Sequence, residues 1–195
     1  VCFNDSNIIN IAKAVKDDGV IPANPPGLPS FTHDDGLIWG RSAEMTWSDG
    51  GRVDGKWLEE GRKHLIKTAA PIKDADQMRD AIKNGFPVTW CGNWGGLMQC
   101  EVKGTPPVLM NRHASSWSHQ ESCHGWWNHP ELGEIYYILN QWGLTAHGRD
   151  PSGGPPGGYW IKKADADWQC KNGECFAFSQ FTGFPAPDYP LPWVF

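Results

Sequence analysis

The sequence lacks any run of about 18 consecutive apolar residues, the length that a membrane-spanning helix requires. It also lacks an excess of positive charge, because 17 Lys and Arg stand against 22 Asp and Glu and the formal net charge is -5. A nucleic-acid-binding protein needs surplus cations to neutralise phosphates, so neither a membrane nor a nucleic acid is expected as a partner. No charged-then-apolar signal segment opens the chain, and a start at Val1 is typical of a processed protein or of a fragment of a longer one.

The chain has enough apolar side chains to form one core. Of its 195 residues 39% are apolar and 20% are charged, which favours a single globular domain over residues 1–195. Its 23 Gly and 16 Pro predict long, shaped loops between short elements. Its 12 Trp allow two interpretations: large side chains that fill a loop-rich core, or stacking platforms for sugars.

The first predicted helix carries a cysteine at its start. Apolar residues from Ile8 to Val15 recur at the i, i+3, i+4, i+7 spacing, which predicts a helix over about residues 4–16. Cys2 therefore stands at or just before a helix N-terminus. The positive end of the helix dipole lowers the pKa of a thiol there and favours the thiolate.

A clearer helix is predicted over residues 74–84. Asp74 can cap it, Gln77 stands three residues later as in a capping box, and Gly85 can end it. Residues 56–64 are weakly helical. The helices thus fall within about residues 1–85.

The part from about residue 86 to 195 is predicted to be rich in strands. Pro130 and Gly133 predict a hairpin connection within it. Helices followed by antiparallel strands make an α+β fold. The β-rich run FPVTWCG predicts a strand over residues 86–92. Further strands are predicted over residues 107–110, 117–127, 134–140, 159–163 and 174–179.

The six cysteines predict two disulfides. An Asn-Gly turn signal between Cys170 and Cys175 would bring their sulfurs face to face, and Cys91 and Cys100 bracket the segment GNWGGLMQ and could form a second bridge. Because disulfides persist in oxidising compartments, an extracellular or virion-associated location is expected. This pairing leaves two cysteines over, Cys2 and Cys123.

One pair of residues suggests a catalytic site. His119 stands at the start of one predicted strand and Asn140 at the end of the next. Such a pair is typical of a catalytic imidazole with an orienting amide, and it calls for a nucleophile elsewhere. A zinc site is a rival interpretation, but the spacing of the candidate ligands matches no common zinc motif, so no metal and no cofactor is predicted. Those candidate ligands are His113, His119, Cys123, His124 and His129.

Over about residues 72–163 the order of motifs resembles the papain-like cysteine peptidases. In that family a helix and a Gly-Pro-Val strand precede the catalytic His. A Gly with an aromatic residue, an Asn-Ser-Trp-Gly motif and, after a glycine-rich loop, a Gly-aromatic run follow it. The counterparts here are Phe86-Pro87-Val88, His119, Gly125-Trp126, Asn140-Gln141-Trp142-Gly143 and Gly158-Tyr159-Trp160-Ile161.

The resemblance implies a loop-rich papain-like fold with an N-terminal helix packed on an antiparallel β-sheet or barrel. It places the nucleophile at the start of the first long helix, where Cys2 is the cysteine that qualifies. His119 would act as base and then acid, Asn140 would orient its ring, and Gln141 and Trp142 would support the pair.

The chain departs from the family in three places. Cys2 is followed by Phe-Asn-Asp and lies outside a Cys-x-x-Cys-Trp motif, Gln141 replaces the usual Ser, and polar residues stand between His119 and Gly125. Among these, His124 is a second candidate for the base, but the glycine expected after it is not at the right distance.

Three functions are compatible with the sequence. The first is a cysteine hydrolase that cleaves peptide or peptidoglycan amide bonds through a thioester, with that peptide or peptidoglycan as its substrate partner. The second is a catalytically inactive papain-like domain that serves as a structural or binding module of a virion or extracellular assembly. The third is a sugar-binding module that uses Trp platforms.

Overall fold

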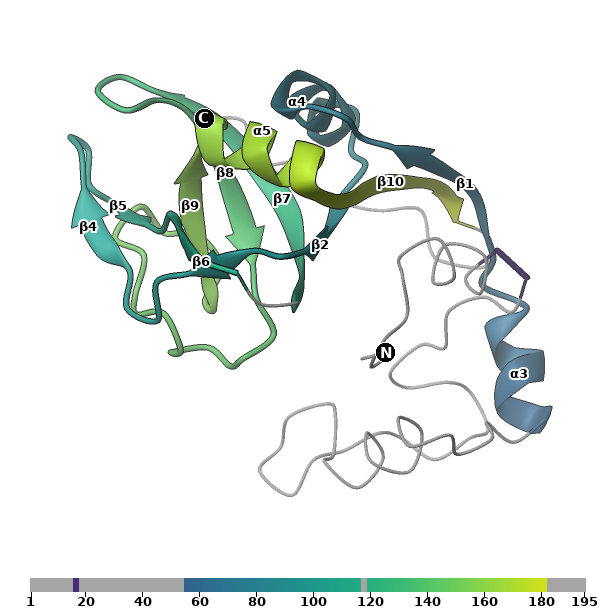
Figure 1. Ribbon diagram of the computed structural model, residues 1–195. Helices are drawn as coiled ribbons and strands as arrows, with labels where there is room; N and C mark the ends of the chain where they lie inside the picture. The colour runs from purple at the N-terminus through teal and green to yellow at the C-terminus, as the bar shows by residue number, and fades with distance from the viewer. Residues whose placement is uncertain (1–15, 18–54, 117–118, 182–195) are drawn as a thin grey trace. The chain divides into compact units, whose positions relative to one another are not determined.

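The computed structural model describes residues 16–17, 55–116 and 119–181 (Figure 1). The predicted helix over residues 4–16, with Cys2 at its start, lies outside this part apart from residue 16. Within these ranges no helix is long and apolar enough to cross a membrane.

The chain divides into two units. One comprises residues 1–68 and 179–187, and the other comprises residues 69–178 and 188–195. In the first unit, helix α3 (Gly55–Gly61) corresponds to the weakly helical prediction. The carboxylate of Glu60 at its end is buried and accepts a hydrogen bond from Lys63 Nζ at 2.5 Å.

Most strands belong to one eight-stranded sheet. From β10 to β4 its neighbouring strands run antiparallel, except that β5 runs parallel to β9. A separate two-stranded sheet pairs β3 (Gly95–Gly96) with β6 (His113–Ser115). The order in the large sheet is β1 (Ile66–Pro71), β10 (Gly173–Phe181), β2 (Val88–Gly92), β7 (His119–His129), β8 (Gly133–Leu139), β9 (Gly158–Lys162), β5 (Val108–Met110) and β4 (Glu101–Lys103).

The centre of the sheet is the hairpin of β7 and β8, as predicted. Its register shifts between Cys123 and Gly125, a bulge that puts Gly125 opposite Tyr137. A Cβ on Gly125 would lie 3.0 Å from Tyr137 Cβ, so a side chain at this position would require Tyr137 to shift. The predicted strands over residues 107–110, 159–163 and 174–179 are confirmed within one or two residues.

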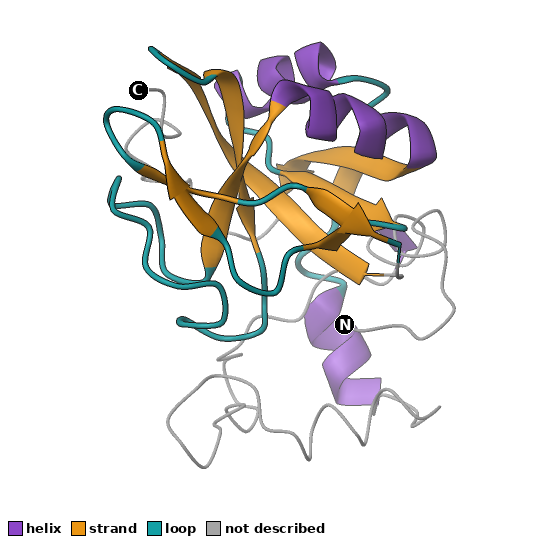
Figure 2. Ribbon diagram, turned by 60° about the vertical axis from the view of Figure 1, so that its left-hand side comes forward, coloured by secondary structure: helices purple, strands orange, loops and turns teal. Residues whose placement is uncertain are grey.

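Helix α4 (Ala75–Lys83) forms where the capping signals place it. The side chain of Asp74 accepts a hydrogen bond from Gln77 N at 2.8 Å, and Gly85 has a φ of +80°, in the left-handed region that favours glycine. Its apolar face, with Met78 and Ile82, packs on the sheet. Helix α5 (Lys163–Asn172) lies beside α4, and Figure 2 shows both over one face of the strands.

Alternation along the central strands gives the sheet two buried faces. On β8, Tyr136 and Ile138 point to the core beneath the helices, whereas Ile135 and Tyr137 join a second cluster with Trp160. Several Trp are fully buried, among them Trp90, Trp94 and Trp160, in agreement with the core interpretation for these positions.

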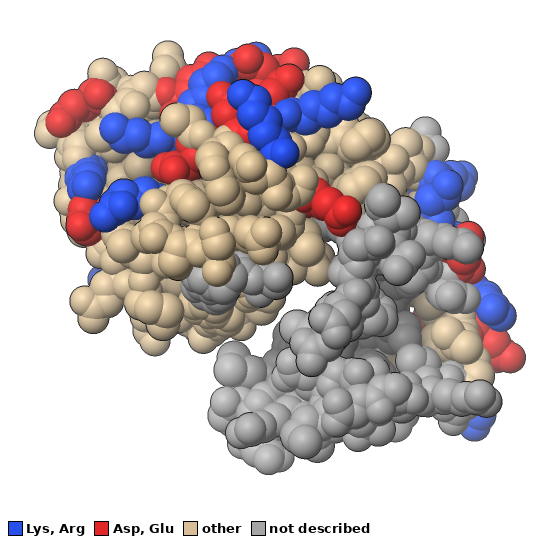
Figure 3. Space-filling view, viewed as in Figure 1, with Lys and Arg blue, Asp and Glu red and all other residues tan. Residues whose placement is uncertain are grey.

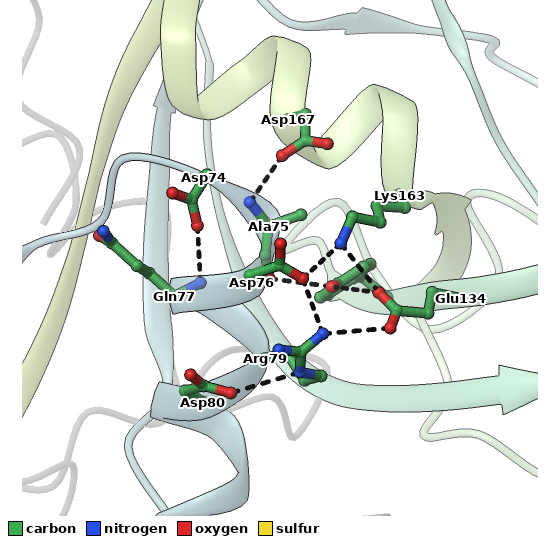
Figure 4. Close-up of polar contacts among 10 residues, drawn as sticks. Asp74, Ala75, Asp76, Gln77, Arg79, Asp80, Glu134, Lys163 and Asp167 are labelled. Carbon is green, nitrogen blue, oxygen red and sulfur yellow. Dashed lines mark hydrogen bonds and ion pairs between the residues drawn. The ribbon is translucent and has the colours of Figure 1, made fainter.

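Ion pairs between charged side chains connect α4, α5 and β8 at the surface (Figure 4). Arg79 contacts Asp76 at 2.7 Å and Glu134 at 3.1 Å, and Lys163 bridges the same two carboxylates. Figure 3 shows acidic and basic side chains gathered in one mixed patch over these helices. Because the groups are partly exposed, each pair contributes little by itself to the free energy of unfolding.

Two sequence-based predictions about the cysteines are wrong. The Asn-Gly signal at residues 172–173 does not form a hairpin, because residues 163–172 form α5 and the strand begins only at Gly173. Neither predicted disulfide is present: Cys170, Cys175, Cys91 and Cys100 all carry free thiols.

Candidate active site

His119 and Asn140 meet at one end of the central hairpin. His119 is the first residue of β7 and pairs with Gly92 of β2, while Asn140 directly follows β8. Since the two strands are antiparallel, the start of β7 and the end of β8 lie at the same edge. The result is a hydrogen bond of 3.0 Å between His119 Nε2 and Asn140 Oδ1.

The backbone decides which way the Asn140 amide points. The N–H of Gln141 donates to Asn140 Oδ1 at 2.8 Å, and a backbone N–H can only donate, so the acceptor atom must be the oxygen. His119 therefore donates through Nε2–H to the same oxygen. Asn140 thus engages Nε2, and Nδ1 is the nitrogen on the other side of the imidazole ring.

The residues that follow Asn140 cover and hold the pair. The ring of Trp142 lies 4.7 Å from that of His119, centroid to centroid, at an angle of 33°, and its side chain remains 39% exposed. Gln141 Nε2 donates to the carbonyl of Gln120 at 2.9 Å, which fixes the loop to β7. The indole thus packs against the His119 ring while part of its own surface faces solvent.

A second histidine lies on the other side of Asn140. His147 is only 5% exposed, and its Nε2 lies 2.8 Å from Asn140 Nδ2. Burial lowers the pKa of His147, a hydrogen bond to the backbone of Met98 partly opposes this by raising it, and the nearby His119 lowers it again. Its loop is anchored by buried Asp150, which accepts hydrogen bonds from Leu109 N and Trp160 Nε1, both at 2.9 Å.

A buried carboxyl group lies under the site. Glu121 is two residues after His119 on β7 and therefore shares its face of the strand. It is 5% exposed, and Tyr159 Oη lies 2.7 Å and 2.8 Å from its two oxygens, while Trp94 Nε1 donates to Tyr159. Burial raises the pKa of Glu121 to about 7.

These groups surround a cavity of about 10 Å³, room for about one water molecule. It is a polar opening beside the imidazole, and a substrate side chain would not fit into it. The lining residues are Trp94, Gly96, Leu97, Asn111, His119, Glu121, Asn140, Trp142, His147 and Tyr159.

Sequence reasoning missed both Glu121 and His147. Glu121 is one of several polar residues between His119 and Gly125, but its position two residues after His119 is a signal that the two share a face of the strand. His147 lies in a loop without periodicity, and no local pattern distinguishes it from a solvated loop histidine.

The other candidate histidines lie elsewhere. His124 is exposed and contacts Ser122 Oγ at 2.8 Å, on the face of β7 opposite to His119. His113 packs against Trp168 at 3.9 Å between ring centroids, and His129 is buried with its Nε2 2.7 Å from the carbonyl of Pro106. In the part of the chain that the structure describes, no three His, Cys, Asp or Glu side chains form a metal-binding group.

The described cysteines are poorly suited to act as nucleophiles. Burial raises the pKa of the Cys91 thiol, raises that of Cys100 to about 12, and raises that of Cys123, which has no exposed surface. The pKa of Cys175 rises because its thiol is hydrogen-bonded to Cys170 and buried. A raised pKa keeps a thiol protonated and weakly nucleophilic.

Comparisons with known proteins agree with an α+β fold of the cysteine-protease kind. No family model and none of the curated proteins match the sequence. The structure is similar to that of xylellain, a cysteine protease from Xylella fastidiosa, with a TM-score of 0.51 and 11% sequence identity. The match covers 89% of this chain but 61% of xylellain, so this chain spans less than two thirds of that protein. At this identity the likeness concerns the fold, a large sheet with few helices.

Proposed function

We propose that the protein is a papain-like cysteine hydrolase in which Cys2 is the nucleophile, His119 the general base and acid, and Asn140 the residue that orients the imidazole. The observation that carries the proposal is the hydrogen bond from His119 Nε2 to Asn140 Oδ1 beneath the Trp142 ring. The fold shared with a cysteine protease supports it.

The reaction would begin from a thiolate–imidazolium pair. The Cys2 sulfur attacks the carbonyl carbon of an amide, and a C–S bond forms as the carbonyl π electrons move to oxygen. Collapse of this intermediate breaks the C–N bond, and His119 gives its Nδ1 proton to the departing amine. The products of this half-reaction are a free amine and a thioester on Cys2.

The second half-reaction returns the enzyme to its starting state. His119 takes a proton from water, and the resulting hydroxide adds to the thioester carbonyl. Collapse breaks the C–S bond, releases a carboxylic acid and restores the thiolate and the imidazolium. Throughout, Asn140 Oδ1 accepts from Nε2–H and keeps the ring plane constant.

The amide would belong to a peptide or to a peptidoglycan cross-link. An extracellular or virion-associated location and possible assembly partners are parts of this proposal that derive from the sequence alone. The predicted disulfides, which favoured that location, are absent from the structure.

The proposal is tested by hydrolysis of unfolded protein and of purified peptidoglycan by wild type, Cys2→Ser, His119→Ala and a matched control, His124→Ala. His124 lies on the same strand but is exposed on the opposite face, so its loss should leave the rate unchanged. Cys2→Ser and His119→Ala should abolish the release of new amino groups. Equal rates in all four proteins would refute the proposal, and no hydrolysis by a folded wild type would favour the inactive structural module.

A further inference from the structure

His147 occupies a confined position next to the proposed catalytic pair. It lies seven residues after Asn140 in the loop between β8 and β9, and only 5% of its surface is exposed. The Trp142 ring stacks on it at 5.7 Å and 28°, and the Tyr159 ring meets it edge-on at 4.8 Å and 78°. The imidazole therefore has little freedom to turn.

The hydrogen bonds of Asn140 determine the protonation of His147. Because Asn140 Oδ1 is fixed by the Gln141 N–H, the atom that faces His147 is Nδ2, which can only donate. His147 Nε2 must accept that hydrogen bond, so the ring is neutral and its proton is on Nδ1. Two imidazoles thus contact one amide in opposite roles: His119 donates to it and His147 accepts from it.

We propose that His147 is a positioning residue: by accepting a hydrogen bond from Asn140 Nδ2, it holds the amide in the orientation that directs His119, and it does so only as a neutral imidazole. The consequence for catalysis rests on the proposed function. The hydrogen-bonding role itself does not depend on it.

Protonation of His147 would set an N–H against the N–H of Asn140. Either the contact breaks, or the amide turns over and presents Nδ2 to the N–H groups of His119 and Gln141, which also need an acceptor. In both cases His119 loses its fixed partner. The site should therefore lose activity as pH falls through the pKa of His147.

Other groups that titrate also face His147. His119 on β7 becomes a cation in the proposed ion pair and disfavours a second positive charge, whereas Glu121 on β7 would favour one when it is ionised. Tyr159 on β9 stays neutral, since burial raises its pKa well above the usual value. On the loop itself, buried Asp150 is engaged by Leu109 N and Trp160 Nε1.

The first test uses nitrogen NMR of the histidine rings in the intact chain and requires no activity. At about pH 7, His147 should give the signals of the neutral Nδ1–H form, and His119 should carry a proton on Nε2. A His147 ring that is charged, or protonated on Nε2, at this pH would overturn the inference.

The second test follows the rate of Cys2 alkylation against pH in wild type, His147→Gln, His147→Ala and the control His124→Gln. Gln can accept from Nδ2 but does not titrate, so His147→Gln should keep its reactivity to a pH about one unit lower than wild type. His147→Ala has no acceptor and should react up to about 100-fold more slowly at every pH. A His147→Gln profile identical to that of wild type contradicts the proposal.

The variant Glu121→Gln tests whether the other titrating group of the cavity, and not His147, controls the pH dependence of the alkylation rate. If the acid limb of the profile moves in this variant and not in His147→Gln, Glu121 controls the pH dependence and the inference is wrong. If Cys2 in wild type reacts no faster than Cys91, the proposed hydrolase function fails. The NMR tautomers still decide the role of His147.

Discussion

Replacement of Glu121 by Gln tests the electrostatics of the site directly. The carboxyl group is 5% exposed, and its pKa rises from 4.5 to about 7 on folding because burial disfavours the charged form. A group whose folded pKa is raised stabilises the fold at low pH and loses that contribution as pH rises. Wild type should therefore be destabilised between about pH 4.5 and pH 8.

The size of the effect follows from the two pKa values. One pKa unit corresponds to about 1.4 kcal/mol, so the change from 4.5 to about 7 amounts to about 3 kcal/mol in the free energy of unfolding. Gln keeps an acceptor for the Tyr159 hydroxyl and does not titrate. The free energy of unfolding of Glu121→Gln should lack this pH dependence. Above pH 8 it should exceed that of wild type by about 3 kcal/mol.

The assay is urea unfolding of both proteins across this pH range, with Glu131→Gln as the control for loss of an exposed carboxylate. His147 has a lowered pKa and therefore costs stability as pH falls. Because both proteins contain His147, its contribution cancels in the difference between their free energies of unfolding. A difference that does not change with pH, or a wild type that gains on the variant as pH rises, would refute the reasoning.

Three further substitutions give measurable effects. Trp142→Ala should expose the hydrogen bond of His119 to water and lower the hydrolysis rate about tenfold, with little change in urea unfolding because the indole is 39% exposed. Gly125→Ala should lower the free energy of unfolding by about 1–3 kcal/mol, since its Cβ would lie 3.0 Å from Tyr137 Cβ, and unchanged urea unfolding would contradict the bulge geometry. Asp74→Ala removes the cap of α4 and should cost about 1 kcal/mol by the same measurement, and a neutral result would show that the cap is dispensable.

Elements with strong local signals could be predicted from the sequence. Asp74, Gln77 and Gly85 mark the ends of α4 through side-chain and backbone chemistry that acts within a few residues. The β7–β8 hairpin likewise follows from the short connector with Pro130 and Gly133 between two predicted strands. That hairpin brings the two site residues found from the sequence, His119 and Asn140, to one edge.

Elements that depend on distant contacts could not be predicted. Helix α5 buries only small or polar side chains, Ala166, Gln169 and Cys170, so it shows no apolar period. Glu121 and His147 become part of the site only because β7, β9 and the loop between β8 and β9 all line one cavity. Their pKa values are set by burial, which is a property of the fold and is not visible in the spacing of residues.

The most direct test of the central claim is the alkylation of Cys2 by iodoacetamide at about pH 5.5, followed by mass spectrometry, in wild type and His119→Ala. An ordinary thiol is only about 0.1% thiolate at this pH. We predict that Cys2 in wild type is labelled at least about tenfold faster than the half-buried Cys91, and that His119→Ala removes this advantage. Labelling of Cys2 at the rate of Cys91, or at a rate that His119→Ala leaves unchanged, would contradict this prediction.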